Sequence, residues 1–133
     1  MRKTARIILG VSTAALLLGS LGTAPVSLAQ GSLPSSEDCK AKPTDPVVQG
    51  GCVIIDRKKG NCFVCHLIAG HSSGNIAPPL VSMKQRFPDK AKLRAQVWDA
   101  RVANPNTVMS PYGAYGILSE DEIDKVVEFL LTL

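Results

Sequence analysis

Two cysteines and a histidine stand together as Cys62-Phe63-Val64-Cys65-His66, the C-x-x-C-H pattern of covalent haem attachment. The two thiols can add across the two vinyl groups of haem, and their i, i+3 spacing puts both sulfurs on one side of a tight turn. His66 follows directly, so its imidazole can reach the iron from the proximal side. The sequence therefore predicts one covalently bound haem c, attached through Cys62 and Cys65 and ligated by His66.

Zinc binding and thiol redox chemistry are the alternative uses of this motif. Zinc would need a fourth ligand from Cys39, Cys52 or His71, and the chain has no second C-x-x-C and no H-x₃-H pair. A thioredoxin-like redox pair would need a βαβ pattern around it, which is absent. Both alternatives are therefore weaker than haem attachment.

The second axial ligand of the iron has three candidates, Met109, Met83 and His71. His71 lies only five residues beyond His66, which is too near in sequence to cross to the opposite haem face. Met83 stands beside charged residues in a short predicted helix, where a core-filling role is the simpler interpretation. Met109 lies in a loop bounded by Pro and Gly, and His/Met ligation is typical of electron carriers. We therefore predict His66 and Met109 as the axial pair, with an open iron as the alternative.

The proximal histidine also needs an acceptor for its Nδ1–H, because that hydrogen bond sets the tautomer and the ring orientation. Residues 75–80 form a stiff loop with two consecutive prolines. A carbonyl on such a loop cannot easily swing away, so Pro78 is the predicted acceptor for His66. A plain rigid turn is the alternative interpretation.

The first 29 residues predict an export signal. A basic start precedes an apolar stretch at 7–21, and Ser27-Leu28-Ala29 matches a signal-peptidase site, with Gln30 as the new N-terminus. An uncleaved membrane anchor is the alternative, since residues 7–36 carry no charge. No Arg-Arg pair is present at the start, so general secretion is favoured over the twin-arginine route. The predicted location is the periplasm, where c-type haem is attached and disulfides persist.

Removing that segment changes the composition of the chain. The 133 residues become 104, and the loss of three basic residues lowers the net charge from +4 to about +1. A large multidomain enzyme and a disordered chain are both excluded, and nucleic-acid binding loses its support in composition. Aromatic residues make up only 5% of the chain, so a large flat cofactor could supply the missing apolar bulk.

The hydrophobic pattern predicts a small all-α domain over residues 50–133, preceded by an extended N-terminal arm over 30–49. Its best signal is near the C-terminus, where Ser119 and Glu122 form a capping box ahead of an apolar face with helical spacing. Trp98 is expected to pack in the core. The other predicted helical segments are 52–59, where a strand is also possible, a turn or two within 80–87, and 90–103.

Together these features resemble the class I cytochromes c, and more narrowly the SoxX family of monohaem subunits in thiosulfate-oxidising SoxAX cytochromes. The resemblance spans residues 51–133, with Ala77 where the broader family usually has Gly and Ser110 where the narrower one tends to have Pro. It rests on the segments 59–66, 74–80, 86–89, 93–99, 104–109 and 116–129.

The resemblance implies a role in electron transfer. In that family a SoxA-like partner subunit carries the catalytic haem, and the complex, an L-cysteine S-thiosulfotransferase, joins thiosulfate oxidatively to a cysteine of a SoxYZ-type carrier. The SoxX-like subunit accepts the electrons and passes them to a small diffusible cytochrome. The chain would then be a non-catalytic relay without catalytic residues of its own. A free-standing monohaem shuttle to an oxidase or dehydrogenase is the alternative.

Two further features bear on the fold and on partners. Cys39 and Cys52 are the two cysteines outside the C-x-x-C-H motif, and in an oxidising compartment they are predicted to form a disulfide. A reactive thiol or a bridge to a partner is the alternative. A local basic stretch over residues 84–94 predicts either a solvated helix start or a docking surface for an acidic partner.

Overall fold

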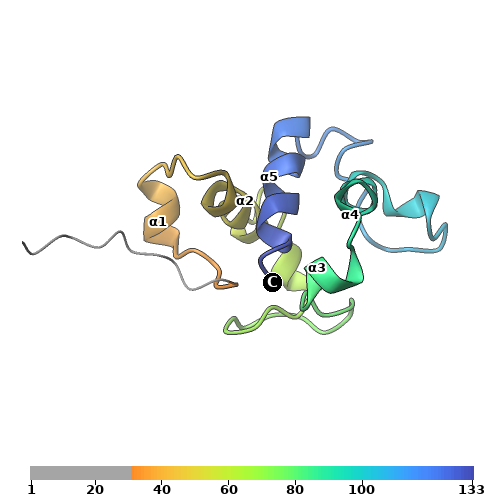
Figure 1. The fold of residues 1–133 in the computed structure, drawn as a ribbon, viewed down its shortest axis with the longest axis horizontal. Helices are drawn as coiled ribbons and strands as arrows, with labels where there is room; N and C mark the ends of the chain where they lie inside the picture. The colour runs from red at the N-terminus through yellow and green to blue at the C-terminus, as the bar shows by residue number, and fades with distance from the viewer. Residues whose placement is uncertain (1–30) are drawn as a thin grey trace, which may run out of the picture.

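A computed structural model of the chain describes residues 31–133, and the predicted export signal lies outside them. The described residues are helical, with no strand and one isolated parallel bridge between His66 and Ala77, which confirms the all-α prediction. Helix α5 lies between α2 and α4 in Figure 1. The helices are α1 (Ser36–Lys40), α2 (Pro46–Ile55), α3 (Met83–Arg86), α4 (Lys90–Trp98) and α5 (Glu120–Leu130), with 3₁₀ turns η1 (Cys62–Val64) and η2 (Ala100–Val102).

Helix α5 begins at the predicted capping box. The Ser119 hydroxyl accepts from the Glu122 backbone N–H, and the Glu122 carboxylate accepts from the Ser119 N–H. The predicted apolar face is buried except for Leu131, which is half-buried at the C-cap. The buried residues of α5 are Ile123, Val126, Val127, Phe129 and Leu130.

Helices α2 and α5 form the main contact of the fold, and a glycine makes this contact possible. A Cβ at Gly50 would lie 2.0 Å from the backbone oxygen of Lys125. Because that atom belongs to a helix backbone, it cannot move aside as a flexible side chain could. The two helices therefore approach each other as closely as they do only because residue 50 has no side chain.

The N-terminal arm is not extended throughout, so that prediction is wrong over much of its length. Ser35 and Asp38 form a capping box that starts α1, and Asp45 caps α2 through a hydrogen bond from the Val47 N–H. Pro46 occupies the first position of α2, where its missing N–H costs nothing. Helix α2 thus begins inside the predicted arm.

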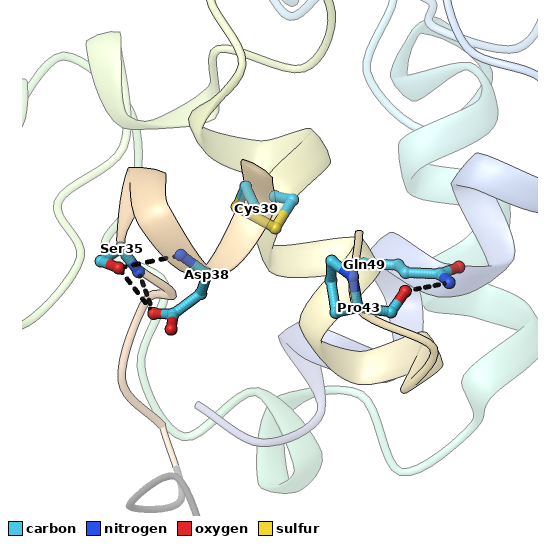
Figure 2. Close-up of a disulfide and its surroundings, with 6 residues drawn as sticks. Ser35, Asp38, Cys39, Pro43 and Gln49 are labelled. Atoms are coloured by element: carbon cyan, nitrogen blue, oxygen red, sulfur yellow. Dashed lines mark hydrogen bonds between the residues drawn. A yellow bond between two sulfur atoms is a disulfide. The ribbon is translucent and has the colours of Figure 1, made fainter. Parts of the chain in front are cut away.

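The predicted disulfide between Cys39 and Cys52 is present and joins α1 to α2, with 5.6 Å between the Cα atoms. Figure 2 shows the bond beside the Ser35–Asp38 capping box. Helix α1 has no buried residue of its own, and the disulfide attaches it covalently to α2. A loop of this size corresponds to about 3 kcal/mol of stabilisation by the chain-entropy model.

Two other boundaries differ from the prediction. Helix α2 ends at Ile55, so the basic residues 57–59 lie in a turn beyond it instead of at its C-terminus. The predicted helix over 90–103 breaks at Asp99, whose backbone is extended (φ −155°, ψ 94°). The Asp99 carboxylate accepts from the Arg101 backbone N–H and so starts η2 as a separate turn.

The core confirms the helix faces that the sequence predicted. Leu93, Val97 and Ala100 are buried as expected, and Trp98 is half-buried against the core. The short helix expected within 80–87 is present as α3. Within residues 31–133, no helix has both the length and the apolar character needed to cross a membrane.

The Gly50 contact gives a direct test of the α2–α5 packing. Replacing Gly50 by Ala is expected to lower the free energy of unfolding of the holoprotein by about 3 kcal/mol, because two helix backbones must separate. Gly70→Ala is the matched control, since a Cβ there meets nothing within 4 Å and the cost is about 1–2 kcal/mol of left-handed backbone strain. Denaturant titration measures both, and equal losses would contradict the tight crossing.

Candidate haem site

One cavity of about 480 Å³ collects the residues that the sequence singled out. Its walls include Cys62, Cys65 and His66 from the C-x-x-C-H segment, Pro78 from the proline loop and Met109 from the loop before α5. The volume lies in the ordinary range for small-molecule and cofactor sites, roughly 300–1,000 Å³. Segments far apart in the sequence therefore converge on one site.

The turn that carries the two cysteines is placed by the end of α2. A Cβ at Gly60 would lie 2.6 Å from the Val53 carbonyl oxygen, so only glycine lets the chain pass this close to the helix. Asn61 then adopts a left-handed conformation, which asparagine tolerates better than most residues. The His66 N–H donates to the Cys62 carbonyl at 2.9 Å, which closes the turn, and neither Cys62 nor Cys65 is in a disulfide.

The His66 ring is held by the predicted acceptor. Its Nδ1 lies 2.6 Å from the carbonyl oxygen of Pro78. A carbonyl can only accept, so Nδ1 carries the proton and Nε2 keeps a free lone pair. Backbone hydrogen bonds on both sides fix this contact, from Ala77 N–H to the Cys65 carbonyl at 3.0 Å and from Leu80 N–H to the Leu67 carbonyl at 2.9 Å. The imidazole is thus oriented to offer Nε2 to a metal.

Local hydrogen bonds shape the loop that carries Met109. The Met109 N–H donates to the Thr107 hydroxyl at 3.1 Å, and the Thr107 N–H donates to the Asn104 carbonyl at 3.0 Å. At the far end Gly113 lies flat on the Trp98 ring, where a Cβ would be 2.2 Å from a ring carbon. The loop therefore keeps a defined path although it has no regular secondary structure.

The rival axial candidates occupy different surroundings. Met83 lines the same cavity, but it is 2% exposed and its sulfur accepts from the Arg86 guanidinium at 3.4 Å. His71 is exposed, packs edge-on against Phe63 and does not line the cavity. The structure therefore brings Met109 and Met83 to the site and leaves His71 outside it.

Two observations bear on the zinc and thiol-redox alternatives. Burial raises the pKa of the Cys62 thiol to about 12. The lowered pKa that is common in redox-active cysteines is therefore not found at Cys62. In the part of the chain that the structure describes, no three His, Cys, Asp or Glu side chains gather into a metal-binding group. The zinc alternative therefore finds no support.

One further polar atom in the cavity wall matters for the fit to haem. The side-chain oxygen of Asn61 is buried without a hydrogen-bond partner in the protein, which is a costly arrangement unless another group satisfies it. Two free thiols, an oriented imidazole and two thioether side chains, of Met83 and Met109, line the same space. This donor set fits haem c, which Cys62 and Cys65 would attach and His66 would ligate.

Tyr112 is a site residue that the sequence did not single out. It lines the cavity, and its hydroxyl donates to the carbonyl oxygen of buried Gly60 at 2.7 Å, next to the cysteine turn. The pKa of Tyr112 is raised to about 12, mainly because its hydroxyl is buried. No local pattern points to this contact, since its two partners lie 52 residues apart.

The predicted basic stretch is partly neutralised by α5. Lys90 pairs with Glu128, and Arg94 pairs with Asp124 at 2.6 Å and with Glu120 at 3.1 Å. These charges therefore hold α4 against α5. They contribute less to an outward docking surface than the sequence alone indicated.

Fold and site together define the class. An all-α domain in which a C-x-x-C-H turn, a proline loop and a methionine loop line one cavity is a c-type cytochrome. The family model for cytochrome c matches residues 57–133, more than half of the chain, and the chain belongs to the cytochrome c family. Membership implies covalently bound haem c and electron transfer by a haem cytochrome. No curated protein matches the chain.

Tyr112→Phe tests the link between the methionine loop and the cysteine turn. The variant leaves the buried Gly60 carbonyl without its donor, so the free energy of unfolding of the holoprotein is expected to fall by about 1–2 kcal/mol at pH 7. Because the pKa of Tyr112 is raised, this contribution is complete below pH 10 and is lost as pH rises to about 12. Denaturant titrations from pH 7 to 12 measure it, and a constant difference between wild type and variant would contradict the account.

Proposed function

We propose that the chain is the electron-accepting monohaem subunit of a periplasmic SoxAX-type complex, which couples thiosulfate oxidatively to a cysteine of a SoxYZ-type carrier. The observation that carries the electron-transfer role is the convergence of His66 and Met109 on the cavity of Cys62 and Cys65. If His66 and Met109 both ligate the iron of a bound haem, no ligand position would remain for a substrate. Such a site transfers electrons without making or breaking bonds to a substrate.

Each residue has a part in this function. The bound haem supplies a one-electron couple between ferric and ferrous iron. The carbonyl of Pro78 holds a proton of His66 on Nδ1, so Nε2 would be available to ligate the haem iron. The thioether of Met109 would be a soft, uncharged ligand, which would raise the reduction potential relative to a second histidine. The chain is thereby tuned to accept electrons readily.

The thiosulfate-oxidising role is supported by the sequence resemblance over residues 51–133 and by the single C-x-x-C-H motif. A one-haem relay fits a complex whose partner subunit carries the catalytic haem. The chain passes electrons on to a small diffusible cytochrome and needs no catalytic residue of its own. The predicted export signal agrees with a periplasmic location for this exchange.

Met109→Leu tests the distal ligand. The ferric holoprotein is expected to show the weak sulfur-to-iron charge-transfer band of a His/Met haem in the far red, and Met109→Leu is expected to abolish it. Met83→Leu is the matched control, because Met83 lines the same cavity, and its band is expected to persist. If the band survives Met109→Leu and disappears in Met83→Leu, the assignment of the ligand is wrong.

Thiosulfate-dependent reduction tests the proposed complex. The holoprotein is purified from its native host, and reduction of its haem is followed by visible absorbance after addition of thiosulfate and the carrier protein. Reduction is expected only while a second cytochrome subunit co-purifies. A monomer that exchanges electrons rapidly with unrelated partners and ignores thiosulfate would instead favour the free-standing shuttle.

A further inference from the structure

The loop that carries Met109, residues 103–114, is closed at its base by contacts outside the cavity. The Trp98 carbonyl accepts from the Gly113 N–H at 3.0 Å and from the Ala114 N–H at 3.3 Å, which ties the end of the loop to the end of α4. Trp98, Gly113 and Ala114 do not line the cavity. Both contacts join backbone atoms, and side chains join the two flanks of the loop at another point.

Arg101 and Tyr115 stand on the two sides of the loop and contact each other. The Arg101 guanidinium donates through Nη1 to the Tyr115 hydroxyl at 2.7 Å, and its central carbon lies 4.7 Å from the Tyr115 ring centroid. Arg101 precedes the loop and Tyr115 follows it. One side chain thus connects the two flanks by a hydrogen bond and a cation–π contact.

Asp99 fixes the direction of that guanidinium. Its two carboxylate oxygens accept from Arg101 Nε and Nη2, each at 2.8 Å, in a two-pronged ion pair. The same carboxylate caps η2, so it is anchored to the backbone of the flank. The pair with Arg101 lowers the pKa of Asp99, so the carboxylate stays ionised at neutral pH.

We propose that Asp99, Arg101 and Tyr115 form a clasp that keeps the Met109 loop closed over the cavity and so keeps the methionine ligand in place. This inference rests on the proposed role of Met109 as axial ligand. The three are positioning residues, since none of them lines the cavity. The clasp opposes the opening of the loop, which must precede any exchange of the methionine for another ligand.

Exposure supports a role specific to the loop. Tyr115 is 66% exposed and the Arg101 side chain 39%, so neither residue contributes much to the core. An exposed aromatic ring stacked on a fixed guanidinium gains little from burial. Its contribution comes from joining the two flanks, and its removal is expected to leave the helices folded.

Imidazole binding to the ferric holoprotein measures how often the loop opens. Tyr115→Ala and Arg101→Ala are expected to bind added imidazole about two- to fivefold faster than wild type, the size expected for losing one exposed contact of this kind. Tyr115→Phe keeps the ring and loses only the hydroxyl, so an intermediate rate is expected. Lys90→Ala, which breaks an exposed ion pair with Glu128 away from the loop, is the control and is expected to match wild type.

Amide hydrogen exchange in the same holoproteins gives a second reading that does not depend on the iron ligand. The Gly113 and Ala114 amides are expected to exchange faster in Tyr115→Ala and unchanged in Lys90→Ala. Unchanged imidazole binding and unchanged exchange would overturn the clasp while leaving the Met109 assignment intact. If wild type lacks the methionine charge-transfer band, the ligand assignment fails instead, and the exchange data alone decide whether the clasp exists.

Discussion

The close contact between α2 and α5 is the constraint on which the rest of the structure depends. Gly50 allows the two backbones to approach, and the apolar face of α5 is buried in the core that this contact creates. The cysteine turn begins where α2 ends, and the methionine loop leads into α5. A change in the crossing would therefore shift the two walls of the cavity relative to each other.

The two sides of the cavity are held in different ways. On the His66 side, short backbone hydrogen bonds and a proline carbonyl fix the imidazole within a few residues of the motif. On the Met109 side, the loop is longer and depends on contacts at its base, including the Arg101–Tyr115 pair. If both residues ligate the haem iron as proposed, His66 would be the more firmly held ligand and Met109 the weaker one. Tyr112 joins the two sides through its bond to Gly60.

The features that could be predicted from the sequence are those that depend on local spacing. The C-x-x-C-H turn, the Ser119 capping box and the Pro78 acceptor each involve residues at fixed short intervals. The Cys39–Cys52 disulfide could be predicted because two cysteines remain outside the motif in a chain with a predicted export signal. The break at Asp99 could not be predicted from local pattern. The residues around it all favour a helix, and nothing in the sequence shows that the Asp99 carboxylate caps a new turn. The pairs of Lys90 and Arg94 with α5 acids depend on how the helices pack, so no local pattern reveals them.

The central claim is that Met109, and not Met83, completes the coordination of a haem held by Cys62, Cys65 and His66. Proton NMR of the reduced holoprotein, with the methionine methyl groups isotopically labelled, tests it most directly, because a methyl group bound above a haem is shifted far upfield by the porphyrin ring. The account predicts one such methyl resonance, and it predicts that this resonance is lost in Met109→Leu. A shifted methyl group that belongs to Met83, or no shifted methyl group at all, would contradict it.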